Sequence, residues 1–164
     1  MLKFGDICVI LGKKCCGKTT LAKVIARNLQ FDFVYIDYTF VNKGYLYDFY
    51  DKNKNRNMVI ILDNYYVYKN NTDIDKLFKS NKKFTLIYVM QYIHLKIFDS
   101  ADIIYIAKET DYEQIKHFHY RLKYYFKNIS LDWVTNAMED LSNFGFLCFD
   151  KDKRFDKEEL YLKI

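Results

Sequence analysis

Short apolar runs alternate along the chain with segments whose apolar residues recur every three or four positions. The runs are rich in β-branched and aromatic residues and predict strands at residues 7–11, 31–37, 58–64, 84–91, 102–107 and 145–150. The helical spacing predicts helices at residues 20–29, 112–126 and 131–141, and shorter ones near residues 46–50 and 74–78. The charged segment 152–164 ends in an alternation that suits an edge strand. Continuous apolar strands that alternate with helices predict an α/β fold, in which a mostly parallel sheet is covered on both faces.

The composition is typical of a globular protein and bounds the choice of partners. Because the chain has 164 residues, no internal repeat and no linker-like stretch, we expect a single domain over residues 1–164. Hydrophobic residues make up 51% of the chain and charged residues 29%, which excludes a disordered protein. The net charge of +5 permits binding to a polyanion without requiring it. No apolar run is long enough to span a bilayer, and the first strand begins too early for a signal peptide, so we expect a soluble intracellular protein.

The four cysteines argue against a zinc site. None belongs to a C-x-x-C pair, no histidine cluster accompanies them, and this usage is typical of a reducing compartment. Cys8 and Cys148 lie in apolar runs, where we expect small core side chains. For Cys15 and Cys16, which precede a predicted helix, two interpretations stay open. Either small residues simply fit there, or the helix N-terminus activates a thiol.

The most specific motif lies between the first predicted strand and the first predicted helix. It matches the phosphate-binding pattern G-x-x-x-x-G-K-[ST] and consists of Gly12-Lys13-Lys14-Cys15-Cys16-Gly17-Lys18-Thr19. Gly12 and Gly17 permit backbone conformations closed to other residues, so successive N–H groups can face phosphate oxygens. Lys18 supplies a cation for the β- and γ-phosphates, and the Thr19 hydroxyl is placed to ligate Mg²⁺. We therefore predict a P-loop domain in which these eight residues and Thr20 bind ATP.

Two further strands end in polar residues that suit ATP chemistry. The strand at residues 58–64 matches the Walker B pattern, and its Asp63 would hold Mg²⁺ opposite Thr19. Asn64 takes the place of the second acid with which many ATP hydrolases polarise water; it cannot act as a base but can orient a water. Gln91 ends a strand at the ligand-facing edge of the sheet, where its amide could contact the γ-phosphate and the attacking water. The predicted catalytic residues are Lys18, Asp63, Asn64 and Gln91, and the predicted metal ligands are Thr19 and Asp63.

These motifs, in this order, resemble the packaging ATPases of large DNA viruses, the poxvirus A32-like branch of the FtsK–HerA superfamily. The resemblance rests on residues 12–19, Ile60-Ile61-Leu62-Asp63-Asn64, Thr85-Leu86-Ile87-Tyr88-Val89-Met90-Gln91-Tyr92, Ser100-Ala101-Asp102-Ile103-Ile104 and Phe146-Leu147-Cys148-Phe149-Asp150. It implies a three-layer P-loop sandwich in which the strand ending in Gln91 lies between the two Walker strands, with Gln91 as a sensor. It also implies an ATPase that uses Mg²⁺, forms a homo-oligomeric ring and translocates double-stranded DNA into a capsid. A capsid or portal protein would be a partner, and the virion or the assembly site in the host cytoplasm its location.

The chain departs from that family at two places. Members usually carry an arginine that reaches into the neighbouring subunit, whereas the matching region here is Lys96-Ile97-Phe98-Asp99-Ser100-Ala101-Asp102. Lys96 or Arg121 could substitute, although neither matches the motif. Since Asn64 also replaces the usual second acid, two alternatives stay open, a slow ATPase and a module that senses nucleotide without hydrolysis.

A small nucleotide kinase is a further interpretation. Such enzymes hold the transferred phosphoryl group with several cationic clamps, whereas this chain has only four arginines, at positions 27, 56, 121 and 154. The order of strands distinguishes the two, because adjacent Walker strands favour a kinase and an intervening strand ending in Gln91 favours a motor. Phosphate release stimulated by DNA would support the motor, and phosphate transfer to an acceptor would support the kinase.

Overall fold

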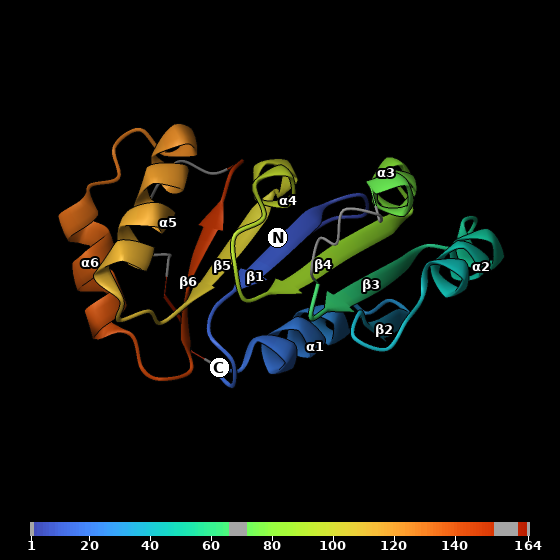
Figure 1. The fold of residues 1–164 in the computed structure, drawn as a ribbon, viewed down its shortest axis with the longest axis horizontal. Helices are drawn as coiled ribbons and strands as arrows, with labels where there is room; N and C mark the ends of the chain where they lie inside the picture. The colour runs from blue at the N-terminus through green and yellow to red at the C-terminus, as the bar shows by residue number, and fades with distance from the viewer. Residues whose placement is uncertain (1, 66–71, 153–160, 164) are drawn as a thin grey trace.

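The computed structural model describes residues 2–65, 72–152 and 161–163, which form one sheet with helices around it (Figure 1). The elements are, in chain order, β1 (Ile7–Leu11), α1 (Lys18–Asn28), β2 (Phe33–Asp37), α2 (Lys43–Asn53), β3 (Met58–Asp63), α3 (Thr72–Ser80), β4 (Phe84–Met90), α4 (Leu95–Ser100), β5 (Ile103–Ala107), α5 (Tyr112–Tyr125), α6 (Leu131–Asp140), β6 (Gly145–Asp150) and β7 (Tyr161–Lys163). Every predicted strand and helix is among them; β1 and β6 have the predicted ends, and the other predicted elements have shifted ends.

The strand order brings the carboxyl ends of three functional strands together. In the described part of the chain, seven strands form the sheet in the order β2-β3-β4-β1-β5-β6-β7. The strands from β2 to β5 in this order are parallel to their neighbours, whereas β6 and β7 are antiparallel additions. β4 lies between β1 and β3 and pairs Met90 with Leu11 and Tyr88 with Leu62. The predicted mostly parallel sheet, with the strand leading to Gln91 between the two Walker strands, is therefore confirmed.

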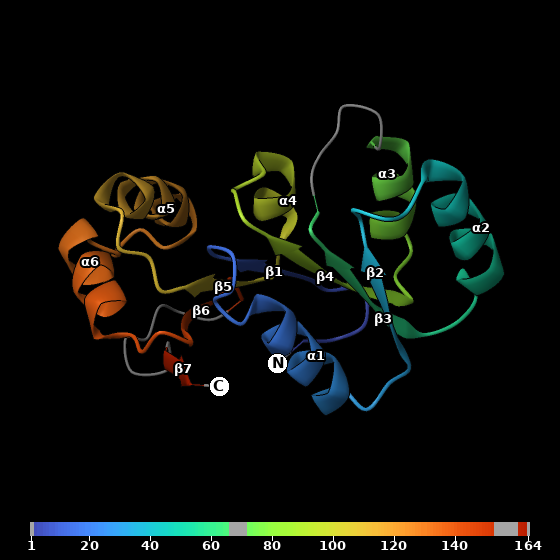
Figure 2. The ribbon, with the colours of Figure 1, turned by 60° about the horizontal axis from the view of Figure 1, so that its bottom comes forward.

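Helices cover both faces of the sheet and give the predicted three layers (Figure 2). Helix α1 packs on one face through Leu21, Ala22 and Ala26. The other described helices contribute apolar side chains to one large core on the opposite face, where α2 packs against α3 and α5 against α6. β1, β3 and β4 are buried along their whole length, because both of their faces are covered.

The apolar pattern does not predict helix α4. This helix spans six residues, and its buried residues Ile97 and Phe98 are neighbours rather than three or four positions apart. A segment of fewer than two turns carries too few positions to establish a helical period. Strand β2 also begins later than expected, at Phe33, and its outward residues are partly exposed because β3 is its only neighbour among the described strands.

The remaining expectations concern the end of the chain and the cysteines. β7 pairs with β6 at the margin of the sheet, as the edge-strand interpretation requires, while residues 153–160 and 164 of that segment lie outside the described residues. Cys8 is buried and Cys148 is half-buried. Among the described residues, no group of three or more His, Cys, Asp or Glu could hold a metal ion. No helix in the same part of the chain combines the length and apolar character needed to cross a membrane.

Candidate nucleotide-binding site

The phosphate loop follows β1 directly and contains three residues with a positive φ. These are Gly12 (155°), Cys15 (63°) and Gly17 (88°). At Gly12 a side chain would also collide with the protein, since an added Cβ would lie 2.5 Å from Ala107 Cβ and 2.8 Å from Cys16 Sγ. A backbone that alternates in this way turns successive N–H groups toward one concave side, which suits an anion.

Helix α1 begins at Lys18 with its first turn available to a ligand. Gly17 caps the helix in the left-handed conformation, and no side chain accepts a hydrogen bond from the first turn. The first turn also carries no acidic residue. Because uncapped N–H groups and the positive end of the helix dipole favour anions, this end of α1 is suited to a phosphate group.

Lys18 lies inside the loop, although it is a charged residue. Its side chain is only 9% exposed, and its Nζ donates a hydrogen bond to the backbone oxygen of Lys13 and lies 3.7 Å from Cys16 Sγ. The surrounding pocket has a volume of about 350 Å³ and is lined by Cys15, Cys16, Gly17, Lys18, Thr19, Thr20 and Phe144. Six of the nine residues predicted to bind nucleotide therefore line one pocket.

Asp63 joins the end of β3 to the start of α1. Its Oδ2 accepts hydrogen bonds from Thr19 Oγ1 at 2.6 Å and from Tyr35 OH at 2.8 Å, and its Oδ1 accepts one from the Asn64 backbone at 2.7 Å. The carboxylate is only 4% exposed. Partial burial, and then the bond to Asp63, raise the pKa of Tyr35 well above its ordinary value, so this hydroxyl stays a donor. The structure thus brings the two predicted metal ligands together and adds Tyr35, which the sequence did not indicate.

The neighbouring residue Asn64 holds a second carboxylate. Asn64 has a φ of 51°, and its Nδ2 donates to Asp37 Oδ1 at 3.2 Å. Asp37 ends β2 and lies beside Asp63 in the sheet. Burial by itself raises the pKa of Asp37, but hydrogen bonds from the Thr39 backbone and from Asn64 outweigh it and hold this pKa below its ordinary value. Asp37 is therefore an ionised group at neutral pH that motif analysis did not find.

Gln91 lies where its motif predicts. It comes directly after Met90, which pairs with Leu11, the residue before Gly12. Its side chain is half-buried. The position places Gln91 at the edge of the sheet from which the phosphate loop starts, while its role as a sensor stays a prediction.

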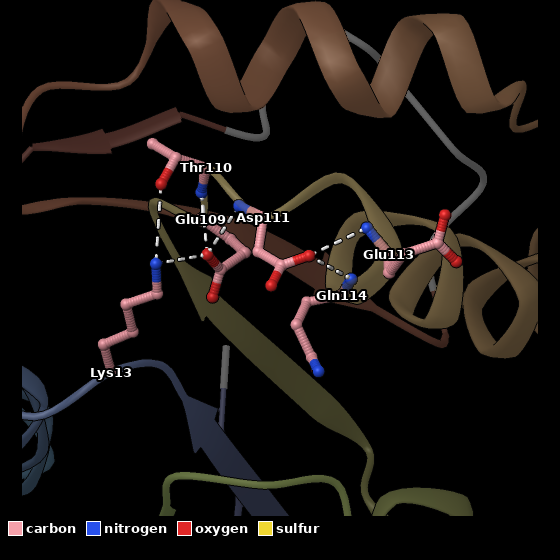
Figure 3. A network of polar contacts seen from close by, with 6 residues as sticks. All are labelled: Lys13, Glu109, Thr110, Asp111, Glu113 and Gln114. Atoms are coloured by element: carbon pink, nitrogen blue, oxygen red, sulfur yellow. Dashed lines mark hydrogen bonds and ion pairs between the residues drawn. The ribbon is translucent and has the colours of Figure 1, made fainter.

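Lys13 and Lys14 differ from the rest of the loop. Lys14 is exposed, and the Lys13 side chain points toward the end of β5, where its Nζ lies 2.7 Å from Glu109 Oε1 and 3.4 Å from Thr110 Oγ1 (Figure 3). The bond to Glu109 raises the pKa of Lys13. In this structure the Lys13 side chain therefore serves an ion pair, and its backbone oxygen serves Lys18.

The partner of Lys13, Glu109, is the other buried acid of this region. It is 6% exposed, and its Oε1 also accepts hydrogen bonds from the backbones of Thr110, at 2.8 Å, and Asp111, at 2.9 Å. Asp111 in turn caps α5 through the backbones of Glu113 and Gln114 (Figure 3). A signal was present in the sequence, because Glu109 follows the strand ending at Ala107, but no motif covers it.

Neither substitute for the arginine lines the pocket at the phosphate loop. Lys96 is exposed on α4. Arg121 is half-buried on α5, where it lines a separate pocket of about 580 Å³ with Asp99, Tyr120, Lys123, Tyr124 and Tyr125. Both helices pack on the face of the sheet opposite α1.

Solved structures with the same fold include viral genome-packaging NTPases and a bacterial branch-migration motor. The genome-packaging NTPase B204 of Sulfolobus turreted icosahedral virus 2, in complex with ATP-gammaS, has a TM-score of 0.67 and 16% identity and covers 92% of this chain and 95% of its own. The DNA-packaging ATPase B204 of Sulfolobus turreted icosahedral virus gives 0.64 and 18%, covering 94% and 96%. The RuvB branch-migration motor of Thermotoga maritima gives 0.50 and 18% over 81% of this chain and 48% of that chain. No curated protein sequence matches significantly.

The family comparison covers the same residues as the site. Residues 8–117 match the model of the ATPase family associated with various cellular activities (AAA). The match runs from β1 into α5 and includes the phosphate loop, Asp63 and Gln91. Nucleotide binding is the common property of such P-loop domains. The chain therefore belongs to the AAA ATPase family.

Proposed function

We propose that this protein is an ATP-hydrolysing motor that translocates double-stranded DNA into a viral capsid. The observation that carries the ATPase part is the 2.6 Å contact between Thr19 Oγ1 and Asp63 Oδ2, beside a loop that already holds the Lys18 ammonium. A hydroxyl and a buried carboxylate side by side are hard oxygen donors of the kind that Mg²⁺ prefers. Thr19 and Asp63 would hold the ion, which supplies positive charge to the β- and γ-phosphates when bound.

The phosphate loop, Lys18 and Gln91 have separate roles in hydrolysis. The loop from Gly12 to Thr20 and the first turn of α1 bind the phosphates through N–H groups. Lys18 releases Lys13 O and neutralises charge that develops on the γ-phosphate. Gln91, at the end of the strand between the Walker strands, contacts the γ-phosphate and reports whether it is present.

Asp37 and Asn64 together replace the missing second acid. The Asn64 amide fixes the Asp37 carboxylate beside Asp63, and the low pKa of Asp37 keeps it able to accept a hydrogen bond from the attacking water. We expect Asp37→Asn to lower kcat for phosphate release roughly 100-fold, with little change in the KM for ATP. Asp32→Asn, at the opposite end of β2, is the matched control and should behave as wild type. An Asp37→Asn enzyme with wild-type kcat would leave water activation to another group.

The DNA-translocating part rests on the fold and on the sequence resemblance. B204, whose fold this chain shares over nearly its full length, is described as a DNA-packaging ATPase, and the motifs resemble the A32-like branch of the FtsK–HerA superfamily. In a homo-oligomeric ring, Lys96 or Arg121 of a neighbouring copy would take the place of the missing arginine, and a capsid or portal protein would receive the DNA. The virion, or the assembly site in the host cytoplasm, is the corresponding location.

The strand order disfavours the kinase, because β4 separates the Walker strands. A nucleotide-binding module with weak or no hydrolysis is the second candidate, and Asn64 favours it.

Phosphate release from ATP, followed with and without double-stranded DNA across protein concentration, tests the proposal. A motor with shared sites should be stimulated by DNA, and its release should rise more than linearly with protein. Lys18→Ala is the negative control, because phosphate release by this site requires the Lys18 ammonium. ATP binding without release under all these conditions would contradict the motor and support the nucleotide-binding module.

A further inference from the structure

One wall of the nucleotide pocket is an exposed aromatic ring that no motif accounts for. Phe144 lies between α6 and β6, is 57% exposed and lines the same pocket as residues 15–20. Its Cδ1 would lie 3.4 Å from a Cβ built on Gly17, so the ring stands against the backbone of the phosphate loop. Ligand pockets are lined mainly by apolar and aromatic side chains with a few polar groups, and Phe144 supplies such an aromatic side chain here.

The antiparallel strand β6 explains how a residue 127 positions after Gly17 comes to lie beside it. β6 pairs with β5 so that Phe146 lies opposite Ala107, the last residue of β5. The residues just before β6 therefore arrive at the carboxyl edge of the sheet, where the loop after β1 also lies. A parallel strand in this place would start at the opposite edge and would present no side chain to the loop.

The turn that carries Phe144 is held in place on both sides. Lys108 Nζ donates hydrogen bonds to the backbone oxygens of Leu141, at 2.5 Å, and Glu139, at 3.1 Å. The Gly145 backbone donates to Ser142 O at 2.9 Å, and a Cβ at Gly145 would lie 2.9 Å from Leu141 Cδ2. The ring is thus presented by a fixed turn rather than by a loose segment, as a preorganised binding surface requires.

We propose that Phe144 stacks on the base of the nucleotide whose phosphates occupy the loop. This inference rests on the nucleotide binding of the proposed function and deepens it by naming the base subsite. Lys18, Thr19 and the ring of Phe144 line the same pocket, so a ligand whose anionic end binds the loop can place a flat apolar group against that ring. A purine base is the part of ATP with a matching flat apolar face, and stacking covers the ring that is otherwise exposed.

Comparing a ligand that has a base with one that has only phosphates distinguishes binding at the base subsite from binding at the phosphate loop. We measure binding of ATP and of inorganic tripolyphosphate, each with Mg²⁺, to wild type and to Phe144→Leu, which keeps an apolar side chain against Gly17 but removes the aromatic face. ATP binding should weaken about tenfold, the loss expected from one stacked base, and tripolyphosphate binding should not change. Tyr124→Leu, which removes an aromatic ring that is 82% exposed on α5, is the control and should leave both affinities unchanged.

A tryptophan at the same position gives a direct readout. Phe144→Trp should bind ATP at least as tightly as wild type, and its added fluorescence should be quenched by ATP and not by tripolyphosphate. Wild-type ATP affinity in Phe144→Leu, or equal weakening toward both ligands, would overturn the inference and leave the proposed function standing. A wild-type protein that binds neither ligand would overturn both.

Discussion

Lys18→Ala should reduce phosphate release from ATP by at least about 100-fold, the cost of removing one preorganised group that stabilises developing charge. Lys18 is the charged side chain inside the phosphate loop, and its ammonium is held there by Lys13 O and Cys16 Sγ. No other side chain that lines the described pocket carries a positive charge. ATP binding should weaken as well, because the β- and γ-phosphates lose the cation that faces them.

The control for this variant is Lys76→Ala, which removes the same charge from an exposed position on α3. Its release rate should match wild type, and both variants should unfold within a few degrees of wild type, because neither residue belongs to the apolar core. A Lys18→Ala protein that released phosphate at the wild-type rate would show that the observed activity belongs to a contaminant or to another site.

Asp63→Asn should weaken the binding of Mg²⁺ and remove most of the activity. The carboxylate accepts hydrogen bonds from Thr19 and Tyr35 through one oxygen, so an amide can still occupy the space and keep part of this geometry. The negative charge is lost, however, and with it the second oxygen ligand of the ion. We expect kcat to fall roughly 100-fold and the Mg²⁺ concentration at half-maximal activity to rise.

A titration of phosphate release with Mg²⁺ at fixed ATP measures both effects. Asp48→Asn, an exposed carboxylate on α2, is the matched control and should give the wild-type curve. Unchanged half-maximal Mg²⁺ in Asp63→Asn would contradict metal ligation by this residue, even if the rate fell.

The α/β fold could be predicted because the composition of the strands already indicates that both faces of the sheet are covered. The runs at β1, β3 and β4 are apolar at nearly every position and buried along their whole length, and strands covered on both faces need this composition. The strand order, in contrast, came from the resemblance and not from periodicity, since a pattern of apolar residues says nothing about which strands are neighbours. The contact between Thr19 and Asp63, which are 44 positions apart, follows from that order.

The residues that sequence analysis missed share a physical reason. Tyr35 lies within β2, Asp37 ends it and Glu109 follows the end of β5, all in segments without a motif of fixed spacing. Their partners, Asp63, Asn64 and Lys13, are in motifs, but the hydrogen bonds between them depend on how adjacent strands align. The position of Phe144 beside the phosphate loop depends on β6, which runs antiparallel to β5. Such long-range register cannot be derived from local patterns.

The carboxylate of Glu109 gives the pocket a mechanical property. It fastens Lys13 of the phosphate loop to the residues that begin α5, so the loop cannot shift alone without breaking an ion pair. Helix α5 packs against α6, and the turn after α6 carries Phe144. These contacts link Lys13 of the phosphate loop, through Glu109, α5 and α6, to the turn that carries Phe144, which lines the pocket at that loop. In this structure the packing of α5 on α6 therefore helps to set where Phe144 stands relative to the phosphate loop.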